Sequence, residues 1–258
     1  YCKPYWFLLF IKYSKKKKIK SIYTNDINSL KILKWVKERK PDIIFCIGWS
    51  QLLKKKILKT ASLGVIGYHP SDLPKNRGRH PIIWSIALGL KKIGSCFFFM
   101  KTRADAGNIV SKKLIKIKKN YDSNLVYKKL IKVGRKQIRE ILLKIRTKKL
   151  KSFPQKNSAS NYWRRRSELD GRIDWRMDAE NINNLVKALA KPYPGAYFLF
   201  KEKKIRVWKS RVVESNKKNY EPGKIKRLKK NWVIKCGNKA LQLITFSPKI
   251  NLKGATYL

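Results

Sequence analysis

The sequence predicts an α/β fold, in which a doubly wound parallel-sheet domain precedes a small C-terminal β-barrel-like domain. Two observations support this prediction. Short apolar runs alternate with segments of helical periodicity through the first 150 residues, as in a parallel sheet covered by helices. After residue 195, short strand-like runs follow one another with turns between them, as in a small β domain. We expect an α/β domain over 1–150, a linker and helix over 151–195, and a small β (OB-like) domain over 196–258.

The elements of the first part follow from hydrophobic periodicity and from the residues that interrupt it. We expect strands over 19–24, 42–48, 63–68, 95–100 and 108–117, and helices over 28–40, 51–60, 81–90 and 122–145. Pro41 ends the first helix, Pro81 opens the third, and Asp122 or Ser123 caps the last. Ligands of such sheets bind beyond the carboxyl ends of the strands, so we expect a site in the loop over 69–80.

The second part changes character after the polar connection over 148–160, which is a candidate domain boundary. Asp178 can cap a helix that Pro192 ends. Four strand-like runs follow, over 196–200, 205–213, 232–236 and 240–246. Their short length and the turns between them favour a small barrel or sandwich.

The charge balance is strongly basic, with 64 Lys and Arg against 15 Asp and Glu, a formal charge of +49. One interpretation is attraction to polyanions such as nucleic acid, or to phosphorylated substrates. The other is compositional drift, because the lysines are spread along the chain rather than clustered. Both are compatible with an anionic substrate and unfavourable to a cationic one.

The cysteines and apolar runs exclude several classes of protein. Cys2, Cys46, Cys96 and Cys236 lie far apart and form no CxxC pair, so we expect neither a metal site nor a disulfide framework. The apolar run Tyr5–Phe10 is too short for a signal peptide or a membrane span. We therefore expect a cytoplasmic protein without a membrane partner.

His69 and His80 are the two histidines of the chain, and both lie in the loop after a predicted buried strand. Acidic residues are scarce, and Asp105 stands in an Asp-x-Gly sequence further along. A loop histidine is a common general base, and a carboxylate partner orients its ring and stabilises its protonated form. In isolation, however, the histidine can serve the turn, and Asp-x-Gly is an ordinary turn element.

The combination of motifs is more specific than its parts. Residues 64–81 read GVIGYHPSDLPKNRGRHP, an aromatic strand follows, and Asp105-x-Gly107-x-Ile109 comes next. This ordered set resembles the catalytic domain of the 10-formyltetrahydrofolate-dependent formyltransferases, of the sugar N-formyltransferase and methionyl-tRNA formyltransferase type. The resemblance implies a Rossmann-like domain, 10-formyltetrahydrofolate as co-substrate and no metal. It also implies a further strand and helix upstream, so we expect the chain to be truncated at its N-terminus.

The resemblance also implies roles for individual residues. His69 and Asp105 take the catalytic positions, and the cofactor-binding residues are Trp49, Ser71, Leu73, Pro74, Arg77, Gly78 and Pro81. The family places an Asn two residues before the His, where it donates a hydrogen bond to the oxyanion, and this chain has Gly67 there. A backbone N–H near Gly67, protonated His69 or Asn76 are the candidate replacements.

The sequence leaves the identity of the acceptor amine undecided between two branches of the family. The sequence RGRHPIIW over 77–84 resembles that of the sugar-nucleotide branch. It therefore favours an amino-sugar nucleotide, a phosphorylated small molecule, as the acceptor. Methionyl initiator tRNA is the alternative, since 236–241 resembles the small C-terminal barrel of the tRNA enzymes and the charge is basic, whereas 188–196 resembles a segment that both branches share. A second alternative is an inactive, polyanion-binding homologue. A homodimer is one option for the assembly.

Overall fold

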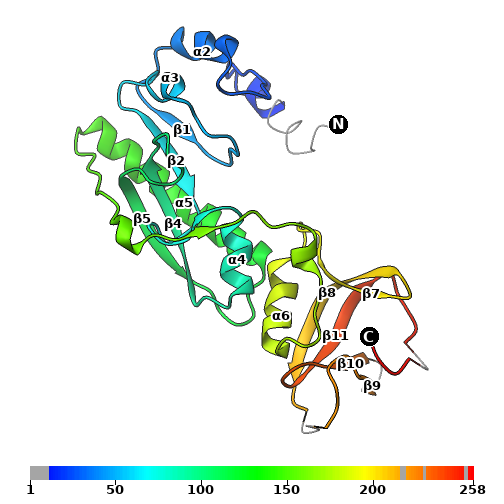
Figure 1. Ribbon diagram of the computed structural model, residues 1–258. Helices are drawn as coiled ribbons and strands as arrows, with labels where there is room; N and C mark the ends of the chain where they lie inside the picture. The colour runs from blue at the N-terminus through cyan, green and yellow to red at the C-terminus, as the bar shows by residue number, and fades with distance from the viewer. Residues whose placement is uncertain (1–11, 216–218, 229–230, 253–254) are drawn as a thin grey trace.

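The chain is built around two larger β-sheets, with helices between them and the N-terminal helices on the far side of the first sheet (Figure 1). The structure is a computed structural model and describes residues 12–215, 219–228, 231–252 and 255–258. The run Tyr5–Phe10 and Cys2, considered above, lie outside the described residues. The α/β class and the separate C-terminal β region are confirmed.

The first sheet holds four strands in the order β1-β2-β4-β5. Their bounds are β1 Ile44–Cys46, β2 Val65–His69, β4 Lys92–Phe99 and β5 Ile109–Lys116. Strands β1 and β2 are parallel, as predicted, but β4 runs antiparallel to both β2 and β5. The sheet is therefore mixed, with a parallel β1–β2 pair and antiparallel pairs beyond it. Strands β4 and β5 follow each other through a short connection, which permits only antiparallel pairing, because a parallel pair needs a long crossover.

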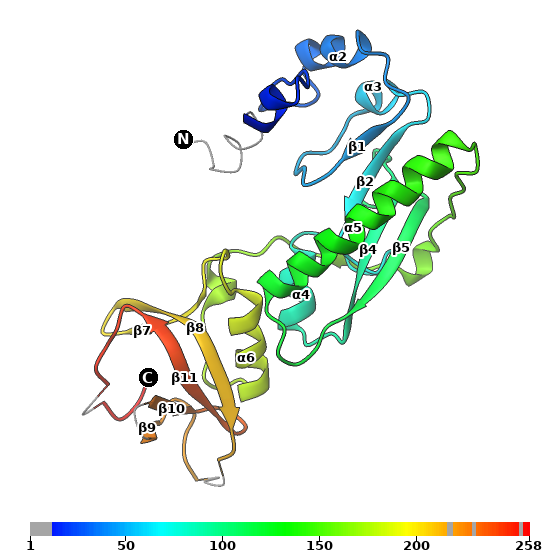
Figure 2. The same cartoon turned by 180° about the vertical axis from the view of Figure 1, so that it is seen from behind.

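Helices cover the first sheet much as the periodicity predicted, with shorter bounds. They are α2 Leu30–Lys37, α3 Lys55–Leu58, α4 Pro81–Ala87 and α5 Ser123–Arg146. The long helix α5 lies across one face of the sheet (Figure 2). It begins where predicted, because the Asp122 carboxylate accepts a hydrogen bond from the Leu125 N–H at 2.8 Å.

The strand expected over 19–24 does not form, and this prediction was wrong. The segment has suitable residues, including Ile19 and Ile22, but a strand also needs a neighbour with which to exchange backbone hydrogen bonds. Strand β1 pairs with β2 on one side, and 19–24 pairs with no strand in the described part of the chain.

The C-terminal sheet is antiparallel, with five strands in the order β7-β8-β11-β10-β9. Their bounds are β7 Ala196–Phe200, β8 Lys203–Val213, β9 Ile225–Leu228, β10 Asn231–Lys235 and β11 Ala240–Ser247. Strand β9 was not predicted, since its sequence IKRL is half basic and its pairing with β10 is what defines it. Helix α6, Ala179–Ala188, packs against this sheet.

One apolar cluster links the two ends of the molecule. It contains Ile82 and Ile86 of α4, Val126 and Leu130 of α5, Ile182 and Val186 of α6, and Ile205 and Ile234 of the C-terminal sheet. Figure 1 shows α4 and α6 side by side between the sheets, and the shared cluster confirms that they pack together. The division at residues 150 and 195 stays a prediction, because the buried core continues across it.

A small parallel ladder ties the loop after β2 to the linker that follows α5. Strand β3, Arg77–Gly78, pairs with β6, Tyr162–Trp163. These segments are far apart in the sequence. Their pairing means that residues of the linker, rather than of the loop itself, fix the path of the loop. Within the part of the chain that is described, no helix is both long enough and apolar enough to cross a membrane.

Candidate active site

His69 and Asp105 come together at the carboxyl end of β2. The His69 ring is buried, with 8% of the side chain exposed, and its Nδ1 lies 3.8 Å from Oδ1 of Asp105, which is 19% exposed. Asp105 belongs to the turn between β4 and β5, so two segments of different origin meet here. The sequence prediction that these two side chains share one site agrees with this geometry.

The hydrogen bond of the second ring nitrogen determines the tautomer of His69. Its Nε2 lies 3.0 Å from the carbonyl oxygen of Asn76. A carbonyl oxygen can only accept, so Nε2 carries a proton and donates. In the neutral ring Nδ1 is then unprotonated and turned toward the Asp105 carboxylate. His69 is therefore arranged to take up a proton at Nδ1, next to a negative charge.

The backbone around Asp105 is held in an unusual conformation. Asp105 has φ of +52°, which is uncommon for a residue with a side chain. Its Oδ2 accepts a hydrogen bond from the Gly78 N–H at 3.0 Å. The Gln155 side-chain amide donates to the carbonyl oxygens of Asp105, at 2.9 Å, and Gly107, at 2.7 Å. These three hydrogen bonds, one to the carboxylate and two to the backbone of the turn, fix where the carboxylate points.

Arg77 supports the same turn from the interior. Its side chain is fully buried, and its guanidinium donates to Gln155 Oε1 from Nη2 at 2.7 Å and from Nε at 3.2 Å. The same guanidinium also donates to the Tyr162 hydroxyl at 3.1 Å. Arg77 thus holds Gln155 in the position from which Gln155 holds Asp105.

A cavity of about 330 Å³ opens at His69 and Asp105. Its walls come from the ends of β1, β2 and β4 and from the loops after them, and include Cys46, Trp49, Gln51, Gly67, Gly78, Arg79, Met100 and Lys101. Two of the predicted cofactor-binding residues, Trp49 and Gly78, therefore face this cavity. Trp49 is 41% exposed, which leaves its ring accessible to a ligand.

The other predicted binding residues build the loop and do not line this cavity. Leu73 is completely buried against Cys96 and Phe98, and Pro74 follows it through a cis peptide bond. Ser71 is buried and donates to the Lys75 carbonyl oxygen at 3.1 Å, so it closes a turn. Arg77 points inward, as described above, and Pro81 is the first residue of α4.

The requirement for glycine at position 78 is steric. Gly78 has φ of +100°, and a Cβ there would lie 2.3 Å from the Trp163 carbonyl oxygen. Any side chain would break the β3–β6 pairing and move the N–H that donates to Asp105.

Several lining residues were not identified from the sequence, among them Gln51, Arg79 and Met100. Arg79 donates from Nη2 to the Ser50 carbonyl oxygen at 3.0 Å, and Gln51 bonds to the backbone of Asn25 and Ile27. Each of the three follows the end of a strand. Their position near strand ends was therefore the one signal in the sequence that could have identified them. Their orientation depends on partners elsewhere in the chain.

The remaining titratable groups of the cavity do not suggest thiol or metal chemistry. Burial raises the pKa of the Cys46 thiol to about 11, so it is a neutral thiol near pH 7 and a poor nucleophile. Among the described residues there is no group of three His, Cys, Asp or Glu side chains that could hold a metal ion.

Comparison with known proteins places this site in a family. Residues 12–142 match the family described as Formyl transferase, and residues 166–257 match the Formyl transferase, C-terminal domain. The chain belongs to the formyltransferase family. The matched N-terminal segment contains His69 and Asp105, and the matched C-terminal segment contains α6 and the C-terminal sheet.

Two curated relatives illustrate the range of this formyltransferase family. The bifunctional polymyxin resistance protein ArnA of Wigglesworthia glossinidia brevipalpis is 36% identical over 234 residues, covering 91% of this chain and 35% of the relative. Methionyl-tRNA formyltransferase of Caldanaerobacter subterraneus subsp. tengcongensis is 32% identical over 217 residues, covering 84% of this chain and 70% of the relative. The chain thus spans about a third of the length of the first relative and more than two thirds of the second.

Solved structures show the same fold at lower identity. WlaRD, a sugar 3N-formyltransferase solved in the presence of dTDP and 5-N-formyl-THF, superposes with a TM-score of 0.69 at 18% identity, covering 93% of this chain and 82% of WlaRD. HypX from Aquifex aeolicus in complex with tetrahydrofolic acid superposes with a TM-score of 0.68 at 18% identity, covering 90% of this chain and 40% of HypX.

This formyltransferase chain departs from the family pattern at Gly67, and the structure shows what fills the space. A Cβ at position 67 would lie 2.9 Å from Met100 Cγ and 3.0 Å from Phe98 Cζ. Met100 therefore occupies the volume next to His69 into which a side chain from position 67 would extend. The side chain of Asn76, another candidate donor, is not part of the cavity wall, and its carbonyl oxygen is engaged by His69.

Proposed function

We propose that this chain transfers the formyl group of 10-formyltetrahydrofolate to the amine of an amino-sugar nucleotide. The observation that carries the proposal is the position of His69 Nδ1, 3.8 Å from Oδ1 of Asp105, in a cavity that both residues line. Membership of the formyltransferase family supports formyl transfer as the reaction. Tetrahydrofolate and formyl-tetrahydrofolate accompany two of the structural neighbours, which supports folate as the donor.

The proposed mechanism assigns to His69 the uptake and the later release of one proton. The acceptor amine attacks the formyl carbon, and the new C–N bond raises the acidity of the amine proton. His69 Nδ1 takes this proton, and the resulting imidazolium is held between the Asn76 carbonyl oxygen and the Asp105 carboxylate. As the bond between the formyl carbon and the folate nitrogen breaks, the His69 imidazolium gives this proton to that nitrogen, and tetrahydrofolate leaves with His69 neutral again. Asp105 orients the ring and stabilises its charge without reacting itself.

Negative charge develops on the formyl oxygen during this step and needs a positive or hydrogen-bonding partner. Gly67 supplies no side chain, whereas Arg79 and Lys101 both line the cavity. We assign the stabilisation to the protonated His69 ring together with the positive field of these two side chains. The same charges favour an acceptor that carries phosphate.

Two features favour an amino-sugar nucleotide as the acceptor. The RGRHPIIW sequence over 77–84 resembles the sugar branch, and two neighbours are named as formyltransferases of sugars or with a dTDP-3-amino sugar bound. Methionyl-tRNA is the second candidate, because a methionyl-tRNA formyltransferase is 32% identical and the chain is strongly basic. An inactive polyanion-binding homologue is the third.

Mass spectrometry of the products tests the proposal. The purified chain is incubated with 10-formyltetrahydrofolate and, in separate reactions, with amino-sugar nucleotides of both uridine and thymidine diphosphate and with methionyl initiator tRNA. We expect the added mass of one formyl group on an amino sugar. Formylation of methionyl-tRNA alone would support the second candidate, and folate binding without transfer to any acceptor would support the third.

A substitution of Gln155 can test its role in positioning Asp105 separately from its contact with Arg77. In Gln155→Glu, the new carboxylate still accepts from Arg77, but it cannot donate to the carbonyl oxygens of Asp105 and Gly107. We expect kcat to fall about 10- to 100-fold, the loss typical of a misplaced catalytic group, while KM for folate changes little. Steady-state kinetics measure both parameters.

A thermal melt provides the control for this variant. Gln155→Ala removes one acceptor of a buried guanidinium and should lower the melting temperature more than Gln155→Glu does, since the glutamate keeps this acceptor for Arg77. A wild-type kcat in both variants, with only the melting temperature lowered, would show that Gln155 has a purely structural role.

A further inference from the structure

The loop after β2 supports its own backbone as far as Lys75, whose carbonyl oxygen accepts from the Ser71 hydroxyl at 3.1 Å. The next residue, Asn76, carries the carbonyl oxygen to which His69 Nε2 donates. Two N–H groups flank this carbonyl along the backbone, those of Asn76 and Arg77. Both have their hydrogen-bond acceptors outside the loop, in the linker that follows α5.

Asn161, directly before β6, is the acceptor for both of these N–H groups. Its side-chain Oδ1 lies 2.8 Å from the Asn76 nitrogen, and its backbone carbonyl oxygen lies 3.0 Å from the Arg77 nitrogen. Asn161 belongs to neither of the segments that match the two family models, 12–142 and 166–257. A single residue of the linker therefore holds two successive peptide groups of the loop.

These two peptide groups set the direction of the Asn76 carbonyl. The N–H and C=O of one peptide group lie in a plane and point in opposite directions. The Arg77 N–H and the Asn76 carbonyl share one such plane. This plane is bound to Asn161 through its N–H and to His69 through its carbonyl oxygen. The preceding plane is bound to Asn161 Oδ1 through its N–H and to the Ser71 hydroxyl through its carbonyl oxygen.

The backbone angle between the two planes needs this support. Asn76 has φ of +62°, in the left-handed region that residues with a side chain seldom adopt, although Asn tolerates it better than most. If the Asn76 N–H loses its acceptor, rotation of φ toward the ordinary region turns the carbonyl away from His69 Nε2. The Oδ1 of Asn161 opposes this rotation.

The Asn76 carbonyl in turn determines which nitrogen of His69 is free. The hydrogen bond made by one imidazole nitrogen decides whether the other is protonated. Without an acceptor at Nε2, the neutral ring gains by carrying its proton on Nδ1, which lies 3.8 Å from Oδ1 of Asp105, a charged acceptor. In that tautomer Nδ1 has no lone pair with which to take a proton from the attacking amine.

We propose that Asn161 is a positioning residue for formyl transfer, which keeps His69 in the tautomer with an unprotonated Nδ1 by holding the backbone of Asn76. The inference rests on the proposed function, in which His69 is the base. Asn161 is not among the residues that line the reaction cavity, so it acts through the loop and not on a ligand. Its loss should therefore change kcat and not the KM for folate.

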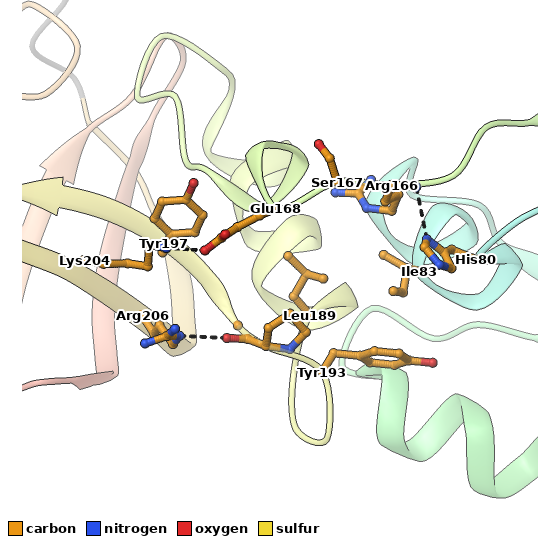
Figure 3. A pocket seen from close by; sticks show the side chains of 13 residues that line it. His80, Ile83, Arg166, Ser167, Glu168, Leu189, Tyr193, Tyr197, Lys204 and Arg206 are labelled. Atoms are coloured by element: carbon orange, nitrogen blue, oxygen red, sulfur yellow. Dashed lines mark hydrogen bonds and ion pairs between the residues drawn. The ribbon is translucent and has the colours of Figure 1, made fainter. Parts of the chain in front are cut away.

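¹⁵N NMR of the histidine side chains tests the inference without any turnover. The chain contains two histidines, so the spectrum is simple. His80 is the internal reference: its Nδ1 accepts from the Arg166 N–H of the same linker at 3.2 Å, at the wall of a second cavity of about 420 Å³ (Figure 3). At about pH 8.5, where an ordinary histidine is neutral, we expect both His69 and His80 to be protonated on Nε2 in the wild-type chain.

The decisive comparison is between Asn161→Ala and Asn161→Asp. The alanine removes the acceptor of the Asn76 N–H, whereas a carboxylate oxygen of the aspartate still accepts from it. In Asn161→Ala we expect part of His69 to carry its proton on Nδ1, and kcat to fall about 2- to 10-fold, the ratio that corresponds to the net loss of one hydrogen bond. The KM for folate should stay within about two-fold, as expected when the cavity itself is unchanged. Asn161→Asp should keep the wild-type tautomer and the wild-type kcat.

Ser158→Ala is the matched control, because it truncates an exposed side chain of the same linker. We expect it to change neither the histidine signals nor kcat. Movement of the His80 signals together with those of His69 in Asn161→Ala would mean that the whole linker is displaced, and it would overturn the assignment to this one side chain.

Three further results would overturn the inference. They are a lower kcat in Asn161→Ala while His69 keeps its proton on Nε2, an unchanged tautomer and kcat in that variant, and a wild-type His69 that is protonated on Nδ1. Failure of the wild-type chain to formylate any amine would reject the proposed function instead. The spectra of the variants would then still decide whether Asn161 sets the tautomer of His69.

Discussion

Replacing His69 with Asn is expected to lower kcat for formyl transfer by about 100- to 10,000-fold, the usual contribution of a general base. The new amide cannot take a proton from the attacking amine, and it ends near the position of Nδ1, one bond short of the Nε2 that donates to the Asn76 carbonyl oxygen. Single-turnover formyl transfer, followed by mass spectrometry, measures the loss at the chemical step.

The partner carboxylate provides the control for this prediction. Asp105→Asn removes the negative charge that faces His69, whereas Asp72→Asn removes a carboxylate of the same loop that pairs with Lys112 at 2.8 Å and lies outside the reaction cavity. We expect a strong decrease of kcat for the first variant and little change for the second. Retention of kcat within about ten-fold in His69→Asn would exclude His69 as the general base.

Restoring the family Asn at position 67 should have the opposite effect, provided that space is made for it. Gly67→Asn alone forces its side chain against Met100, because a Cβ already approaches Met100 Cγ to 2.9 Å. We expect this single variant to lose stability without gaining activity. Combined with Met100→Ala, the amide can enter the cavity and donate to the oxyanion, and kcat should rise by up to about 100- to 1000-fold.

Stopped or quenched-flow measurement of kcat for the two single variants and the double variant tests this coupling. Met100→Ala alone enlarges the cavity without adding a donor, so it separates the effect of space from that of the amide. No gain in the double variant over Met100→Ala would mean that other groups, such as Arg79, already supply the stabilisation. The stability of each variant follows from its melting temperature.

In the first sheet, some elements follow from the local sequence and others depend on their neighbours. Helix α5 and its cap at Asp122 were predictable, because a long apolar stripe and a capping carboxylate act within one segment. The direction of β4 and the lack of a strand over 19–24 were not, because pairing partners decide both. Periodicity reports which residues are buried and carries no information about the neighbour that buries them.

The candidate site divides in the same way. The sequence alone determined that His69 and Asp105 belong together, since an ordered motif within one stretch of chain names both residues and the loop between them. Only the tertiary structure decided that Gln155 and Arg77 hold Asp105, that Met100 fills the space beside Gly67, and that Asn161 holds the backbone of Asn76. The physical reason is that these effects depend on side chains from distant segments, whose meeting is set by the packing of the whole chain rather than by any local pattern.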